Sequence, residues 1–172
     1  MSSFIEQESI LLKQDEKHFN YIINSFQDDI NKICRSFSSN LNEFDDLRQD
    51  VLINIWKGLS SFQNNSKLRT WIYRVSINTC VSSYRYGKKK HEVPEIINFE
   101  ISLNTNEYES AQWLAKALGS LNPIDHSIML MWLDDFSYEE ISEVIGLNRN
   151  TVATRIRRYK ELIKRVITNK SF

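Results

Sequence analysis

The chain of 172 residues contains few of the glycines, prolines and cysteines that β folds and disulfide-stabilised folds require. It has only four glycines and two prolines, whereas sandwiches and barrels need many turns built from these residues. Cys34 and Cys80 are far apart, with no Cys-x-x-Cys pair and no histidine at ligand spacing, so neither a disulfide framework nor a zinc site is indicated. We therefore predict an all-α fold without cofactor or metal, in which both thiols are reduced and buried.

Long apolar runs are also missing. No segment approaches about 18 uninterrupted apolar residues, and residues 1–8 lack the basic start and apolar run of a signal peptide. Hydrophobic residues nevertheless make up 41% of the chain, which is enough to build one domain or two small ones. We expect a globular, cytoplasmic protein.

Charge is balanced overall but sorted along the chain. Residues 67–90 hold seven basic and no acidic residues, and residues 148–172 hold eight basic and one acidic. Residues 91–147 between them hold one basic and eleven acidic residues. Two separate cationic blocks on a chain of zero net charge indicate two nucleic-acid contacts, kept soluble by the acidic regions.

Residues 137–165 predict a short helix, a tight turn and a longer basic helix, an order typical of domains that bind duplex DNA. Ser137 and Glu140 form a capping box, Gly146 closes the first helix, and the second helix follows from Asn150. Val152, Ile156 and Ile163 form its inward stripe. The side chains left outward suit base edges and phosphates: Arg149, Asn150, Thr151, Thr154, Arg155 and Arg158.

Three helices are predicted in the N-terminal half. The inward face of the first is spaced by threes and fours: Phe19, Ile22, Phe26, Ile30, Ile33 and Phe37. The second carries Leu47, Val51, Ile55 and Leu59, with Asp45 and Asp46 at its positive end. After an exposed polar loop over residues 60–66, the third runs from about Lys67 to Tyr86. Its aromatics alternate with cations, a pattern suited to melted DNA, although Trp71 also suits a core position.

Three segments are predicted from these patterns: residues 1–90, an acidic linker over residues 91–108, and a second domain over residues 109–172. The linker could reach about 60 Å when fully extended. Within the second domain, Asn122 and Pro123 predict the start of a helix that continues to Leu133.

The order of motifs resembles the sigma factors of RNA polymerase, specifically the short sigma-70 type of the extracytoplasmic-function (ECF) subfamily. The segment from Asp46 to Trp56 is similar to region 2.2, and the segment from Leu68 to Thr79 is similar to regions 2.3 and 2.4. The segments 121–123, 135–141 and 151–156 are similar to region 4. The resemblance implies two small helical domains, a region 2 bundle and a region 4 helix-turn-helix, joined by a flexible linker.

The resemblance also implies a function without catalysis. The N-terminal domain would bind core RNA polymerase and capture the melted minus 10 strand of promoter DNA, and the C-terminal domain would read the minus 35 element as duplex. An anti-sigma factor is a further possible partner. The polymerase-facing residues implied are Asp46, Gln49, Asn54 and Trp56. The minus 10 residues are Phe62, Asn64, Asn65, Ser66, Lys67, Arg69, Arg74, Asn78, Arg85, Lys88, Lys89 and Lys90.

Two alternatives were weighed from the residues alone, and only the first remains open. A stand-alone helix-turn-helix regulator would use the same C-terminal domain and would bind a palindromic site without polymerase. An enzyme has no support, because Gly87-Lys88 lacks the glycines of a phosphate loop and His18, His91 and His126 are isolated.

Overall fold

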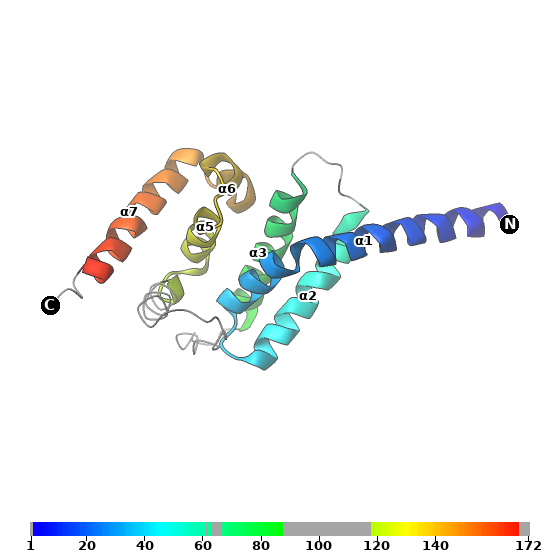
Figure 1. Ribbon diagram of the computed structural model, residues 1–172, viewed down its shortest axis with the longest axis horizontal. Coiled ribbons are helices and arrows are strands. Elements are labelled where there is room, and N and C mark those ends of the chain that lie inside the picture. Colours follow the sequence, from blue (N-terminus) through cyan, green and yellow to red (C-terminus); the bar gives the residue numbers. More distant parts are fainter. Residues whose placement is uncertain (1, 61, 63–66, 88–117, 169–172) are drawn as a thin grey trace.

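A computed structural model describes residues 2–60, 62, 67–87 and 118–168, with side chains described for residues 16–60, 62, 67–85 and 118–161. Within these ranges the chain is helical and contains no strand (Figure 1), so the all-α prediction is confirmed. The helices are α1 (Ser2–Phe37), α2 (Leu41–Leu59), α3 (Leu68–Gly87), α5 (Pro123–Leu133), α6 (Tyr138–Ile145) and α7 (Arg149–Thr168). The predicted linker, residues 91–108, lies outside the described residues.

Helices α1, α2 and α3 pack against one another as a three-helix unit. The stripe predicted for α1 faces its core, which also takes residues from the other two helices. Its most buried members include Ile22, Ile30, Ile33, Val51, Ile55, Ile72 and Ile77. The thiols of Cys34 and Cys80 are both buried and unoxidised, and they meet between α1 and α3. The predicted buried thiols are therefore confirmed.

Helix α2 begins at Leu41, about one turn before the start predicted from Asp45 and Asp46. Asn40 is its N-cap and accepts a hydrogen bond from the Glu43 backbone N–H at 2.9 Å. Glu43 in turn accepts from the Ser39 backbone N–H at 2.7 Å. Because this reciprocal cap already satisfies the exposed backbone donors, Asp45 and Asp46 lie in the second turn and not at the helix start.

Helices α5, α6 and α7 form the C-terminal unit. Asn122 caps α5 and Pro123 occupies its first turn, as predicted. The core between the three helices is aliphatic and thioether in character, with Ile128, Met129, Met131, Ile141, Val152 and Ile156 fully buried.

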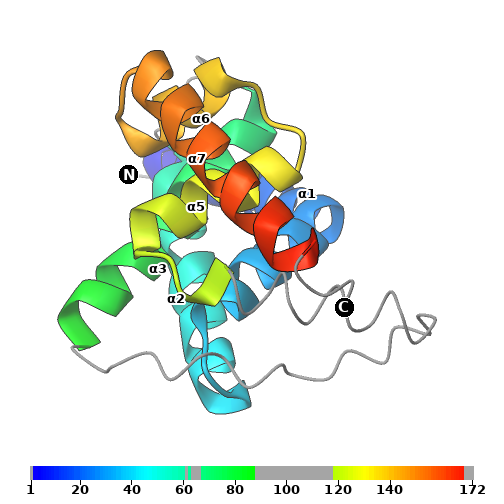
Figure 2. The same cartoon turned by 90° about the vertical axis from the view of Figure 1, so that its left-hand side faces the viewer.

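The two units are in contact, because α3 packs against both α5 and α6 (Figures 1 and 2). The sequence predicted two units joined by a linker and did not predict a contact between them. Opposite charges meet in this contact: Lys32 of α1, Lys67 just before α3 and Arg74 of α3 pair with Asp134, Glu140 and Glu143 of the C-terminal unit. Phe136 is also buried there, 6% exposed, against Tyr73 of α3.

Candidate nucleic-acid interface

The helix-turn-helix of the C-terminal unit is built by local caps. In α6 the Ser137 backbone N–H donates to Glu140 Oε2 at 3.0 Å, and the Glu140 backbone N–H donates to Ser137 Oγ at 3.2 Å. Gly146 ends the helix in the left-handed conformation, with φ of 76°, which glycine adopts without steric cost. The predicted capping box and glycine stop are both confirmed.

Helix α7 starts one residue before the predicted Asn150. Asn148 Oδ1 accepts hydrogen bonds from the Thr151 backbone N–H at 2.8 Å and from the Thr151 hydroxyl at 2.9 Å. Val152 and Ile156 lie at the predicted inward positions and are fully buried. The Ile163 side chain lies outside the described residues, and Tyr159 continues the buried stripe in its place.

The exposed face of α7 contains most of the residues predicted to contact duplex DNA: Arg149, Asn150, Thr154 and Arg158 are exposed and Thr151 is half-buried. Arg149 is ion-paired with Glu139 of α6 and lies over the Tyr138 ring, 5.7 Å from its centroid. Thr154 donates its hydroxyl proton to the Asn150 carbonyl at 2.8 Å. The first two turns of α7 therefore present cationic and amide groups together on one accessible surface.

Arg155 differs from the other candidates on α7. Its Nη1 donates to Asp125 Oδ1 at 2.6 Å, and the Tyr159 hydroxyl donates to Asp125 Oδ2, also at 2.6 Å. Burial alone would raise the pKa of Asp125, but hydrogen bonds from Tyr159, Arg155 and Asn122 outweigh it and lower the pKa below its ordinary value. The spacing could have indicated this, because a residue three after Val152 and four before Tyr159 lies toward the inward side of a helix.

On α3 and at Lys67 just before it, the predicted minus 10 cations fall into two groups. Lys67, Arg69 and Arg74 lie on the side that contacts the C-terminal unit. Lys67 Nζ is 3.0 Å from Glu140 Oε1, and Arg74 Nη2 is 2.5 Å from Glu143 Oε1. Arg69 Nε is 3.0 Å from Asp29 Oδ2, and its Nη1 donates to the Asp134 carbonyl at 3.2 Å. Arg85, at the far end of the helix, is exposed.

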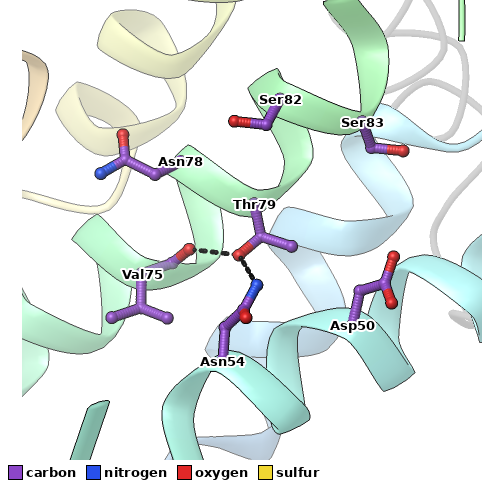
Figure 3. Close-up of a pocket in the computed structure, with 7 residues that line it drawn as sticks. All are labelled: Asp50, Asn54, Val75, Asn78, Thr79, Ser82 and Ser83. Carbon is purple, nitrogen blue, oxygen red and sulfur yellow. Dashed lines mark hydrogen bonds between the residues drawn. The ribbon is translucent and has the colours of Figure 1, made fainter. Parts of the chain in front are cut away.

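Asn78 lies one turn after Arg74 on α3 and lines a polar groove between α2 and α3 (Figure 3). Across this groove, Asn54 Nδ2 donates to Thr79 Oγ1 at 3.0 Å, and Thr79 donates to the Val75 carbonyl at 2.8 Å. The structure thus brings Asn54, predicted to face the polymerase, next to the Asn78 side of the candidate DNA surface. The remaining lining residues are Asp50, Ser82 and Ser83.

Only some of the aromatic and loop residues predicted to bind the minus 10 strand lie in the described part of the chain. Phe62 is half-buried, with its ring centroid 5.1 Å from that of Trp71. Trp71 also packs closely over Gly58 of α2, so it holds the loop against the bundle, as the core alternative predicted. Asn64, Asn65, Ser66 and Lys88–Lys90 lie outside the described residues.

All four residues predicted to face the polymerase are exposed on α2: Asp46, Gln49, Asn54 and Trp56. Trp56 is 40% exposed and makes an edge contact with Phe19, with ring centroids 5.2 Å apart. Ile53 is 41% exposed and lies three residues before Trp56, hence on the same face. Ile53 was not among the predicted residues, although its position off the Leu47–Val51–Ile55 stripe could have indicated it.

Neither a metal centre nor a membrane-spanning helix is found in the described parts of the chain. No cluster of three or more His, Cys, Asp or Glu side chains there could hold a metal ion. None of the helices in those parts combines the length and apolarity needed to cross a bilayer.

Comparison with known proteins gives a consistent result over most of the chain. The model of sigma-70 region 2 matches residues 22–90, and a model of sigma-70 region 4 matches residues 111–163. The ECF RNA polymerase sigma factor SigW of Bacillus subtilis is 26% identical over 169 residues, covering 89% of this chain and 90% of that protein. The ECF RNA polymerase sigma-E factor of Escherichia coli is 27% identical over 167 residues, covering 88% and 87%.

The fold agrees with solved structures as well. The sigma factor RpoE from Bartonella quintana, in complex with the anti-sigma factor NepR, superposes with a TM-score of 0.72 at 22% identity, covering 90% of this chain and 99% of that chain. CnrH, in complex with the cytosolic domain of CnrY, gives a TM-score of 0.67 at 22% identity, covering 94% and 97%. With both matched regions in order and relatives aligned over nearly the full length, the chain belongs to the ECF subfamily of sigma-70 RNA polymerase sigma factors.

Proposed function

We infer that this protein is a promoter-specificity factor that binds core RNA polymerase in the cytoplasm and directs initiation, with no catalysis of its own. The observation that carries this inference is the presence of regions 2 and 4 in one chain, each with its own cationic helix. A helix-turn-helix alone would support the alternative of a stand-alone regulator. That alternative is not favoured, because residues 22–90 match region 2.

We propose that the exposed start of α7 reads the minus 35 element. Arg149, Asn150 and Thr154 lie on its accessible surface, where guanidinium, amide and hydroxyl groups can reach base edges and phosphates of the major groove. Arg158 extends that surface by one turn. Arg155 is assigned a positioning role, because its guanidinium is bound to Asp125.

We propose that α3 and the loop before it capture the melted minus 10 strand. Arg69, Arg74, Arg85 and the sequence Lys88–Lys90 would hold phosphates, and Asn78 supplies an amide beside them. Extruding a base costs a few kcal/mol, so the aromatic pair Phe62 and Trp71 offers a stacking surface that offsets part of this cost. The loop residues Asn64, Asn65 and Ser66 are assigned to the same site on the resemblance alone.

The exposed face of α2 is the proposed polymerase contact. Trp56 and Ile53 supply apolar area, and Asp46 and Gln49 supply polar groups around it, a composition typical of protein interfaces. An anti-sigma factor is a further proposed partner, since RpoE and CnrH were each solved with a protein partner.

The experiment that tests this function is reconstitution with core RNA polymerase. The expected result is a stable complex that starts transcripts at discrete positions, which transcript sequencing would identify. Trp56→Ala should weaken core binding, whereas Arg149→Ala combined with Thr154→Ala should leave core binding intact and reduce initiation. Absence of core binding by the unaltered protein, together with specific binding to a palindromic DNA site, would favour the stand-alone regulator instead.

A further inference from the structure

Gly58, in the last turn of α2, lies directly beneath the indole ring of Trp71. A Cβ atom at position 58 would lie 3.0 Å from Trp71 Cζ2 and 3.7 Å from Cη2. The first distance is shorter than the ordinary contact between two carbon atoms, which is about 3.5–4.0 Å. Because glycine has no side chain, the Trp71 ring can lie against the backbone of α2.

The backbone at Gly58 does not itself require glycine. The residue is helical and has no positive φ, and glycine is less favourable than alanine in the interior of a helix. The feature that distinguishes this position is the ring packed over it. The close approach of Trp71 therefore accounts for a glycine here.

The same ring belongs to the aromatic pair proposed to stack an extruded base. The Phe62 and Trp71 ring planes are tilted by 40°, with centroids 5.1 Å apart. The chain is turned from α2 toward Phe62 by two backbone hydrogen bonds. The Ser60 N–H donates to the Gly58 carbonyl, and the Phe62 N–H donates to the Leu59 carbonyl at 3.2 Å. With the backbone held in this way, the relative position of the two rings depends on how closely Trp71 lies against α2.

We propose that Gly58 is a positioning residue for base capture, which holds Trp71 and Phe62 in the arrangement that presents a stacking surface to one base of the minus 10 strand. The proposal rests on the proposed function, because it matters only if these rings stack a base. Alanine at position 58 would push the Trp71 ring away by a few tenths of an ångström. Stacking needs close contact between ring faces, whereas phosphate contacts come from cations elsewhere on α3. The displacement should therefore weaken capture of the base and leave the hold on the strand backbone unchanged.

Holoenzyme reconstituted with core RNA polymerase and a set of labelled oligonucleotides tests the proposal. The intact probe is a fluorescein-labelled single strand with the non-template minus 10 sequence of a promoter found by transcript sequencing. In the other probes one base at a time is replaced by an abasic sugar, which removes stacking and keeps every phosphate. The position where the unaltered holoenzyme loses most affinity identifies the extruded base. The ratio of intact to abasic affinity at that position measures base capture.

Gly58→Ala should lower this ratio about three- to tenfold, with the affinity for the abasic strand unchanged. Asn42→Ala is the matched control, because it places alanine at an exposed position at the other end of α2, and it should keep the ratio. Core binding and melting temperature are measured for both variants to show that each is folded. An unchanged ratio for Gly58→Ala would overturn the proposal, and so would equal losses of affinity for the intact and abasic strands.

A double-mutant cycle tests whether position 58 acts through the indole ring. Trp71→Phe keeps an aromatic ring but removes the outer ring atoms Cζ2 and Cη2 that lie over Gly58. In this background Gly58→Ala should leave the ratio unchanged, and a reduction of the same size in both backgrounds would overturn the proposal. If the unaltered holoenzyme bound intact and abasic strands equally at every position, the stacking role of Phe62 and Trp71 would fail and the proposal with it. A clear ratio that Gly58→Ala does not change would exclude only the role of Gly58.

Discussion

The Arg155 guanidinium of α7 donates a hydrogen bond to the buried Asp125 carboxylate of α5, with Nη1 and Oδ1 2.6 Å apart. The same carboxylate also accepts from Tyr159, one helical turn further along α7. These bonds tie α7 to α5 within the C-terminal unit. We propose that Arg155 acts on DNA recognition through the position of α7 and not through a base contact of its own.

Replacing Arg155 should reduce stability more than it changes base preference. Arg155→Ala leaves Asp125 buried with fewer partners, and because Tyr159 and Asn122 still bind it, we expect a loss of about 1–3 kcal/mol in the free energy of unfolding. Arg157→Ala, at an exposed neighbouring position, is the matched control. Urea unfolding measures both, and equal midpoints would contradict the positioning role.

Acid should destabilise the protein partly through Asp125. Its folded-state pKa is lowered, so the stabilisation is fully present above the ordinary aspartate pKa of about 4 and is lost as pH falls through the lower folded value. Asp125→Asn should therefore be less stable at neutral pH and show a flatter decline below about pH 4. Thermal unfolding between pH 2 and pH 7, compared with Glu161→Gln, measures the difference, and parallel profiles would exclude this carboxylate as a source of the acid response.

Asp135 should be a site where glycine stabilises the fold. Its φ of 61° lies in the left-handed region, which costs an L-residue roughly 1–2 kcal/mol. We expect Asp135→Gly to raise the melting temperature and Gly146→Ala, at φ of 76°, to lower it by a comparable amount. Asp135→Val should be destabilising, because a β-branched side chain fits this conformation poorly. Melting temperatures in the reverse order would contradict the strain argument.

The lysines that follow α3 should determine part of the salt dependence of DNA binding. Replacing Lys88, Lys89 and Lys90 together with alanine should lower the slope of log affinity against log salt by up to about 0.7 per lost contact to single-stranded DNA. Titrations of a single-stranded oligonucleotide that carries a non-template minus 10 sequence, at several salt concentrations, would measure the slope. A slope equal to that of the unaltered protein would remove these lysines from the DNA interface.

Features encoded within a few residues could be predicted from the sequence. The caps at Asn122 and Ser137 and the glycine stop at Gly146 depend on neighbouring backbone groups, so local pattern was sufficient. The start of α2 was missed because Asn40 competes with Asp45 and Asp46 as a start signal, and only the hydrogen bonds decide between them.

Contacts between distant residues could not be predicted in the same way. The pairing of Arg74 with Glu143 joins residues 69 positions apart, and nothing in either local pattern selects that partner. The charge sorting did indicate complementary blocks, but it was interpreted only as two DNA contacts. The residues that connect the units, Asp134 and Phe136 above all, were consequently assigned no role in a contact between them.

Glu140 divides its two carboxylate oxygens between two tasks. Oε2 accepts from the Ser137 backbone within α6, whereas Oε1 accepts from Lys67 of the other unit. The backbone donor of Ser137 contributes most to lowering the pKa of this carboxylate, followed by Lys67, so the side chain stays ionised when the lysine departs. The capping box that begins α6 therefore does not depend on the contact with Lys67, and loss of that lysine would leave the start of the helix-turn-helix intact.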